Sequence, residues 1–338
     1  MTIVMGFDQH REQITWDALD SSTGELRRGR IRPADRLSFR HFLGQFDGER
    51  LEAALEATTG WRFMVEELKA VGAEVHLAEP AETKILRGPK RRAKTDRADA
   101  KHLRELLQQR RVPESWIPPE QILELRSLVR LRRALVEQRT AWLQRIHAQL
   151  FHHGHPARRD LLVRERRAWV EGLELPHAAR TQIEIALRLI DHLNVQLVPL
   201  DRELRQIANS WPGTKALQAH YGVGPLTAVA FLAELGDARR FSSSRKAVRY
   251  AGLDITVSQS DSKRAPGRLS RQGPATLRWA AFEAAQSAHK PSSPDRDYYL
   301  QAADRLGGNR ACLALARKLV QRAFHTLREL GEEALQPA

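Results

Sequence analysis

Two aspartates in a strongly basic stretch are the first residues whose types and spacing could do chemistry. Asp96 and Asp99 lie in KTDRADA, and residues 87–111 hold ten Lys or Arg against three acids. The segment that follows has helical spacing, so the two carboxylates share one face at the start of a helix. One interpretation is structural, because acids in a first helical turn favour the helix dipole and can cap its end. The other is a metal site, which requires further carboxylates elsewhere in the chain.

Composition narrows the class of protein. The 338 residues are 42% hydrophobic, so the chain is globular and long enough for two or three domains. The formal charge of +14 suits a phosphate polymer as partner. An anionic membrane is the competing partner, but no apolar run reaches about 18 residues and no leader is recognisable, so we expect a cytoplasmic protein without a membrane. Cys312 is the only cysteine, which excludes a disulfide framework and a Cys-based zinc site.

The first third of the chain predicts a mixed sheet in which two strands end at acidic residues. Residues 2–8, 13–19 and the stretch after the Ser21–Gly24 turn read as an antiparallel meander. Helical spacing at 35–47 and 61–71 alternates with strands at 51–56 and 74–79, which predicts parallel β-α-β units. We therefore expect an α/β domain with helices on the sheet faces. Asp8 ends the first strand and Glu56 ends the fourth.

Long helices follow from residue 113 onward. Residues 120–152 and 177–208 are amphipathic, which predicts an antiparallel helical hairpin or a coiled-coil arm. A dimer interface and an intramolecular bundle explain this spacing equally well. The boundaries that we predict are 1–112 for the α/β domain, 113–210 for the helical region and 211–338 for a mostly α C-terminal domain.

The C-terminal region holds features that could contact nucleic acid. Gly222-Val223-Gly224 separates two helices and could expose backbone N–H groups to a DNA phosphate, or simply make a tight turn. A polar basic loop follows within 251–285, and a basic helix spans about 309–330. Basic side chains here and beside the aspartates could contact phosphates or remain solvated charges; they are Lys94, Arg97, Lys263, Arg264, Arg268, Arg271 and Arg278.

Four carboxylates then become candidates for one metal centre. In a mixed sheet that begins with the meander, the first and fourth strands are neighbours, and a later helix can cross their ends. Asp8, Glu56, Asp96 and Asp99 would then meet around a space suited to Mg²⁺, or Mn²⁺, which take oxygen ligands. Two such ions can assist phosphodiester cleavage.

These motifs together resemble a known family. FDQH at Asp8, LEATTGW at Glu56 and KTDRADAKHL at Asp96 and Asp99 are similar to those of the DEDD-type insertion-sequence transposases, whose N-terminal domain is like the RuvC resolvase. YGVGPLTAVAFLAELGDARRF, AGL and the GRLSRQG stretch resemble the family's C-terminal transposase domain. The resemblance covers nearly the whole chain, in the right order and spacing.

The resemblance implies a fold, a reaction and partners. It implies a RuvC/RNase H-like domain whose carboxylates bind Mg²⁺, a helix-hairpin-helix, and a serine that forms a covalent phosphoserine with DNA. By position this serine is Ser260, seven residues before Gly267, with Ser258 and Ser262 close by. It further implies a bridge RNA as guide, assembly as a homodimer or homotetramer, and action at the bacterial nucleoid.

The chain departs from the family pattern at two places, and two rival functions remain. Asp261 stands where the family usually has Gly, and Asp254-Ile255 replaces the Pro that follows GL. An extra charge beside Ser260 could repel the scissile phosphate, or could help bind metal or orient the serine. One rival is a RuvC-like junction endonuclease that uses the carboxylates and water. The other is a catalytically decayed helix-hairpin-helix DNA-binding protein.

Overall fold

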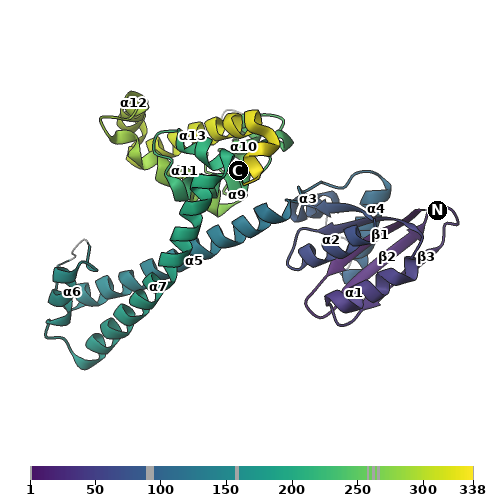
Figure 1. The fold of residues 1–338 in the computed structure, drawn as a ribbon, viewed down its shortest axis with the longest axis horizontal. Helices are drawn as coiled ribbons and strands as arrows, with labels where there is room; N and C mark the ends of the chain where they lie inside the picture. Colours follow the sequence, from purple (N-terminus) through teal and green to yellow (C-terminus); the bar gives the residue numbers. More distant parts are fainter. Residues whose placement is uncertain are drawn as a thin grey trace. The chain divides into compact units, whose positions relative to one another are not determined.

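The chain forms two compact units, residues 1–117 and 118–338. The computed structural model describes residues 2–88, 95–156, 160–256, 259–260, 263–264 and 267–337. The first unit is built around a sheet and the second is mostly helical (Figure 1). The finer boundaries expected at residues 112 and 210 stay a prediction.

A five-stranded mixed sheet forms the centre of the first unit. Its strands are β1 (Thr2–Gln9), β2 (Ile14–Asp20), β3 (Leu26–Ile31), β4 (Arg50–Glu56) and β5 (Glu74–Ala78). The order is β3-β2-β1-β4-β5; the first three strands are antiparallel, whereas β1 and β4, and β4 and β5, pair in parallel. The mixed sheet and the neighbouring positions of β1 and β4 confirm the sequence-based prediction.

The alternation of side chains along β1 divides its residues between two covered faces. Ile3, Met5 and Phe7 are buried on the face covered by α1 (Arg36–Leu43) and α2 (Trp61–Ala70), where Phe7 meets Phe39 edge to face at 5.4 Å. Val4 lies on the other face, in a cluster with Ala54, Ala78, Leu103 and Leu107. Asp8 shares this second face with Val4, because the two are an even number of residues apart.

Helix α4 (Asp96–Gln108) covers the second face and lies unusually close to β1. Thr95 caps it by accepting a hydrogen bond from the Ala98 N–H. Gly6 permits the close approach, because a Cβ there would lie 2.1 Å from the Ala100 carbonyl oxygen. Arg104 then donates from Nε to the buried Asp17 carboxylate at 2.5 Å. Together these contacts hold the first turn of α4 beside the carboxyl end of β1.

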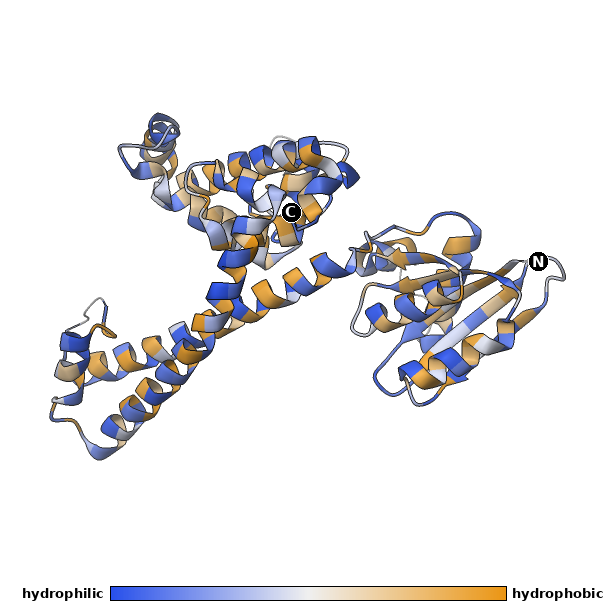
Figure 2. Ribbon diagram, in the orientation of Figure 1, coloured by the Kyte–Doolittle hydropathy of each residue, from blue (hydrophilic) through white to orange (hydrophobic). Residues whose placement is uncertain are grey.

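An antiparallel helical hairpin begins the second unit. Helices α5 (Glu120–His152) and α7 (His177–Ser210) lie side by side, with α6 (Arg164–Glu171) near the turn (Figure 1). Arg132 meets Asp201 at 2.5 Å, whereas Gln149, further along α5, donates to Gln182, earlier in α7. Hydrophobic and hydrophilic residues alternate along both helices (Figure 2). The apolar face of α7 is thus used within the chain, and supercoiling of the pair stays a prediction.

Six further helices complete the second unit. They are α8 (Pro212–Gln218), α9 (Pro225–Leu235), α10 (Ser244–Tyr250), α11 (Ala275–Gln286), α12 (Arg296–Leu306) and α13 (Gly308–Leu330). Helix α9 is buried along almost its whole length, because its residues are apolar on every side. Its one charged residue, Glu234, is fully buried and meets the Arg130 guanidinium with two hydrogen bonds of 2.9 and 2.8 Å. This ion pair fixes the base of α5 to the C-terminal helices.

The remaining elements are short. Helix α3 (Pro80–Leu86) follows β5, and β6 (Gln259–Ser260) pairs with β7 (Lys263–Arg264). Short 3₁₀ turns span Gly44–Phe46, Ala238–Arg240, Ser287–His289 and Gly331–Leu335. Among the described residues, every helix is too short or too polar to cross a bilayer.

Candidate metal centre and nucleic-acid interface

Two of the predicted carboxylates stand at the ends of neighbouring parallel strands. The β1–β4 register pairs Phe7 with Leu55, so Asp8 and Glu56 are the next residues on their strands. Glu56 shares a face with Ala54, which packs against α4, by the same alternation that places Asp8 there. Gln9 ties the two strand ends together, because its Nε2 donates to the Glu56 carbonyl oxygen at 2.7 Å. The sheet therefore presents both residues at one edge and on the α4 face.

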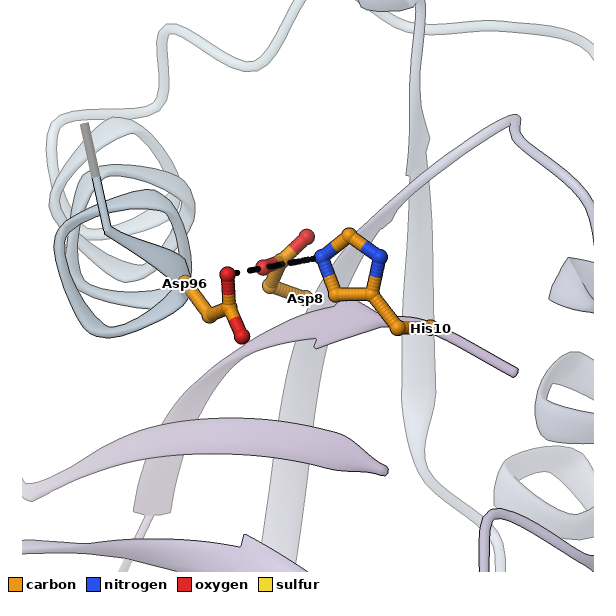
Figure 3. Close-up of side chains that lie close together, drawn as sticks. All are labelled: Asp8, His10 and Asp96. Atoms are coloured by element: carbon orange, nitrogen blue, oxygen red, sulfur yellow. Dashed lines mark hydrogen bonds and ion pairs between the residues drawn. The ribbon is translucent and has the colours of Figure 1, made fainter. Parts of the chain in front are cut away.

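Helix α4 brings the carboxylate of Asp96 close to Asp8, and a histidine contacts both (Figure 3). His10 Nε2 lies 3.2 Å from Oδ2 of Asp8 and 3.6 Å from Oδ1 of Asp96. The other oxygen of Asp96 accepts a 2.9 Å hydrogen bond from Nε2 of Gln13. Ligand atoms of Asp8, His10 and Asp96 all lie within 4.8 Å of one another. This group could hold one metal ion.

The fourth carboxylate, Asp99, is also in the first turn of α4 and is engaged by a cation. The Arg87 guanidinium, directly after α3, forms an ion pair with Oδ1 of Asp99. Asp99 lies near enough to Asp8 for its charge to raise the pKa of the Asp8 carboxyl. Arg87 thus holds a positive charge against the Asp99 carboxylate.

The donor set fits a hard divalent cation. Burial raises the pKa of Asp8, His10 lowers it, and the charges of Asp99 and Asp96 raise it further. Crowded carboxylates that repel one another in this way are stabilised by a bound cation. Oxygen atoms of Asp and Glu are the ligands that Mg²⁺ and Mn²⁺ accept. The residues present are therefore suited to the metal that the sequence motifs predict.

Ser260 belongs to a β-hairpin in the second unit. Its backbone pairs with Lys263, and Gln259 pairs with Arg264. Further down, Thr256 donates from its N–H to the Arg268 carbonyl at 2.8 Å. We call residues 254–270 the serine hairpin. Ser258, Asp261 and Ser262 lie outside the described residues.

Arginines hold the base of the serine hairpin. Arg278 donates from Nη1 to the carbonyls of Ala251 and Gly273, both at 3.1 Å, and burial lowers its pKa. Arg317 donates to the Leu253 carbonyl at 2.6 Å. The carboxylate of Asp254 accepts a hydrogen bond from the Ser270 hydroxyl across the stem. Asp254 therefore ties the two sides of the hairpin together.

The glycine turn between α8 and α9 has two different glycines. Gly222 has φ of +85°, and a Cβ there would lie 2.2 Å from Oγ of Ser287 and 2.3 Å from the Ala284 carbonyl oxygen. Its role in this structure is close packing on α11. Gly224 caps α9 and has nothing within 4 Å of its Cβ position, and an open hollow of about 710 Å³ lies at this turn. Only Gly224 has room for a ligand above it.

The other predicted phosphate contacts are distributed over both units. Arg97 is exposed in the first turn of α4, whereas Lys94 lies outside the described residues. Lys263 and Arg264 form β7 in the serine hairpin, and Arg268 is exposed on its stem. Arg271 is exposed and has a left-handed backbone, with φ of +53°. Among the predicted contacts whose side chains the structure describes, only Arg278 donates its guanidinium N–H groups to main-chain carbonyls. Contact of any of these residues with nucleic acid stays a prediction.

Two residues of the candidate metal centre, His10 and Gln13, were not predicted from the sequence. Both lie in the short turn after β1, where the His10 N–H donates to the Gln13 carbonyl at 2.9 Å. The D-x-H spacing of Asp8 and His10 was the available signal, because residues two apart at a strand end can point to the same side. No local sequence pattern indicated Gln13, because its partner Asp96 is 83 residues away.

Family models of transposases match parts of both units. A family model for DEDD transposases of the IS110 type matches residues 5–153, and one described as "Transposase IS116/IS110/IS902 family" matches residues 214–300. Together the two matches cover more than half of the chain, and they include the carboxylates and the serine hairpin.

Individual relatives agree with the family models. A putative transposase of Sinorhizobium fredii (y4qE) is 32% identical over 189 residues, which are 55% of this chain and 45% of that protein. The transposase of the insertion sequence IS1111A of Coxiella burnetii is 28% identical over 209 residues, 58% of this chain and 56% of that protein. The chain thus spans about half the length of these relatives. The matches to both of its units show that the chain belongs to the IS116/IS110/IS902 family of DEDD insertion-sequence transposases.

Proposed function

We propose that this protein cuts and rejoins DNA strands during movement of an insertion sequence, through a phosphoserine at Ser260. The observation that carries the proposal is the meeting of Asp8, Asp96 and the end of β4 at one sheet edge, in a chain whose two units both match transposase models. The net charge of +14 suits the DNA substrate.

Asp8, Glu56, Asp96 and Asp99 are the proposed ligands of Mg²⁺ or Mn²⁺. A bound divalent ion would supply Lewis-acid stabilisation of charge on phosphate oxygens. The chain's own contribution is to hold the carboxylates in register. Gly6 and the Arg104–Asp17 pair do this by fixing α4 on β1.

Ser260 is the proposed nucleophile. Its Oγ forms a bond to phosphorus while a P–O bond of the DNA backbone breaks, and the serine proton ends on the released hydroxyl. Attack of a DNA hydroxyl on the phosphoserine reverses these steps and restores the serine. A reacting group must be held in a fixed position. The hairpin suits this role because Arg278 and Arg317 hold its base through hydrogen bonds to main-chain carbonyls.

The phosphate contacts and the assembly complete the proposal. Gly224 and the basic residues of the serine hairpin are the proposed contacts to the DNA backbone; Gly222 supports the turn of this helix-hairpin-helix. We also propose a bridge RNA as guide and a homodimer or homotetramer as the active form, acting at the nucleoid. These rest on the family resemblance and on the chain's positive charge.

Covalent trapping tests the reaction. Wild-type protein, incubated with a cleavable DNA from the insertion-sequence ends, the copurifying RNA and Mg²⁺, is expected to give a protein–DNA adduct on a denaturing gel. Ser260→Ala should abolish the adduct, whereas Ser258→Ala and Ser262→Ala are matched controls that should retain it. An undiminished adduct with Ser260→Ala would remove the phosphoserine hypothesis.

The same gel separates the rivals. Cleavage without any adduct indicates a metal-dependent endonuclease that uses water. Binding without cleavage in Mg²⁺ or Mn²⁺ indicates a decayed DNA-binding protein. Asp96→Asn combined with Asp99→Asn should abolish cleavage in either enzymatic case, and retained cleavage would contradict the metal centre. Sequencing the nucleic acid that copurifies with the protein tests the guide.

A further inference from the structure

His10 is placed among the carboxylates of the candidate metal centre but is not a carboxylate. Its Nε2 lies 3.2 Å from Oδ2 of Asp8 and 3.6 Å from Oδ1 of Asp96 (Figure 3). All three ligand atoms lie within 4.8 Å of one another, which is the spread expected for atoms that share one metal ion. The imidazole therefore occupies a ligand position.

The surroundings hold this arrangement in place. The His10 N–H donates to the Gln13 carbonyl, which closes the turn after β1. The Gln13 side chain donates to Oδ2 of Asp96 at 2.9 Å, so the other oxygen of Asp96 faces His10. Arg32 in turn donates to Oε1 of Gln13 at 2.9 Å, which orients its amide. Ligands held by such outer contacts lose less entropy when they bind a metal.

We propose that His10 is a nitrogen ligand of this metal centre and makes it favour Mn²⁺ over Mg²⁺; this rests on the proposed function of the carboxylates. Imidazole nitrogen binds first-row transition ions better than it binds Mg²⁺, which accepts mainly oxygen and keeps several waters. A centre of carboxylates alone would discriminate less between the two ions.

The competing role for His10 is that of a counter-charge. A protonated imidazole beside Asp8 and Asp96 would offset their repulsion, and a metal would then have to displace it. The His10 side chain is 55% exposed and that of Asp96 39%, so the ion pair between these two contributes little stability, and Asp8, which is 15% exposed, is the partner on which this role depends. The two roles predict opposite effects of removing the imidazole on metal affinity.

The experiment measures metal binding by the full-length protein. Glu52, Glu74 and His76 form another group in the same unit that could hold a cation, so all variants carry His76→Ala. Mn²⁺ and Mg²⁺ are titrated by calorimetry into this background, with and without His10→Ala. His41→Ala, at an exposed position of α1, is the matched control. Circular dichroism checks that each variant is folded. If His10→Ala is not folded, His10→Gln replaces it as the test variant.

Loss of His10 is expected to weaken Mn²⁺ binding by about tenfold or more and Mg²⁺ binding by less than about threefold. Electron spin-echo spectra of bound Mn²⁺ should show a coupled nitrogen that disappears in His10→Ala and persists in His41→Ala. Unchanged or tighter Mn²⁺ binding, or no coupled nitrogen in the background protein, would overturn the inference.

A further variant separates this failure from failure of the proposed function. Asp8→Asn should abolish binding of both ions if the carboxylates form the centre. If metal binding is lost in Asp8→Asn but not weakened in His10→Ala, the carboxylate centre is supported and only the role of His10 is ruled out. Absence of any divalent-ion binding in the His76→Ala background would remove both.

Discussion

Gly6→Ala is the substitution that tests most directly how the sheet positions the metal centre. The added Cβ would lie 2.1 Å from the Ala100 carbonyl oxygen and 2.5 Å from the Arg104 nitrogen, both of them backbone atoms of α4. Ordinary contact begins near 3.4 Å, so α4 must move away from β1 by more than an ångström. Rotation of a side chain cannot relieve this contact.

The displacement has two expected consequences. Overpacking of this kind costs about 1–3 kcal/mol of the free energy of unfolding. Because Asp96 and Asp99 lie in the first turn of α4, the same shift moves both carboxylates relative to Asp8. A misplacement of about 1 Å in a catalytic arrangement can cost about 100-fold in rate. We therefore expect modest destabilisation together with a large loss of cleavage.

Three measurements check this expectation. Chemical denaturation gives the free energy of unfolding, calorimetry gives the Mn²⁺ affinity, and the trapping gel gives cleavage. Gly44→Ala is the matched control, because its Cβ would meet nothing within 4 Å and its φ of −59° suits alanine. If Gly6→Ala keeps wild-type stability and wild-type metal affinity, α4 does not contact β1 as described and the reasoning fails.

Three further predictions concern stability and the glycine turn. The Arg40 and Arg36 guanidinium groups lower the pKa of the buried Glu67 from 4.5 to about 2, so the stabilisation from this carboxylate is present above pH 4.5 and is lost as the pH falls toward 2. Because both arginines are exposed, we expect a contribution of about 1–2 kcal/mol to the free energy of unfolding. Denaturation at pH 6 and at pH 3 should show this difference in the wild type but not in Glu67→Gln. Glu234→Ala should cost about 1–3 kcal/mol in the same assay, because it removes the buried acceptor of two hydrogen bonds from the half-exposed Arg130, and a cost under about 0.5 kcal/mol would contradict this. Gly222→Ala should destabilise the protein because of its positive φ and its contact with α11, whereas Gly224→Ala should leave stability unchanged and weaken DNA binding in a filter assay. Equal stability of the two glycine variants, or unchanged DNA affinity with Gly224→Ala, would contradict the separate roles.

Much of the architecture was predictable because it rests on local periodicity. The five strands, the helices over 120–152 and 177–208, and the neighbouring positions of β1 and β4 all agree with expectation. Long amphipathic helices and alternating strands carry their burial pattern in every turn or pair of residues. The short helices α3, α6, α10 and α12 were not predicted, because segments of seven to eleven residues with many charges hold too few periods.

The basic residues show the limit of composition as evidence. Arg278 was expected to contact phosphate, and Arg317 lies on a segment predicted as a basic helix, yet the guanidinium groups of both bind main-chain carbonyls at the base of the serine hairpin. Arg322, on the same basic helix as Arg317, makes a two-hydrogen-bond ion pair with Asp295. Charge alone cannot distinguish an arginine that faces a phosphate from one that satisfies buried carbonyls, because the guanidinium serves both equally well.

The sequence by itself determined the kind of chemistry: carboxylates at strand ends and at a helix start, a serine in a basic loop, and the family to which these motifs belong. Residue types and short spacings carry that information, since each motif is local. Only the tertiary structure decided that His10 contacts both Asp8 and Asp96, that Arg87 engages Asp99, and that Gly6 sets the distance of α4 from β1. These contacts join residues as many as 94 positions apart, as Gly6 and Ala100 are, and depend on helix–sheet packing at sub-ångström precision. No local pattern of residue types encodes such a distance.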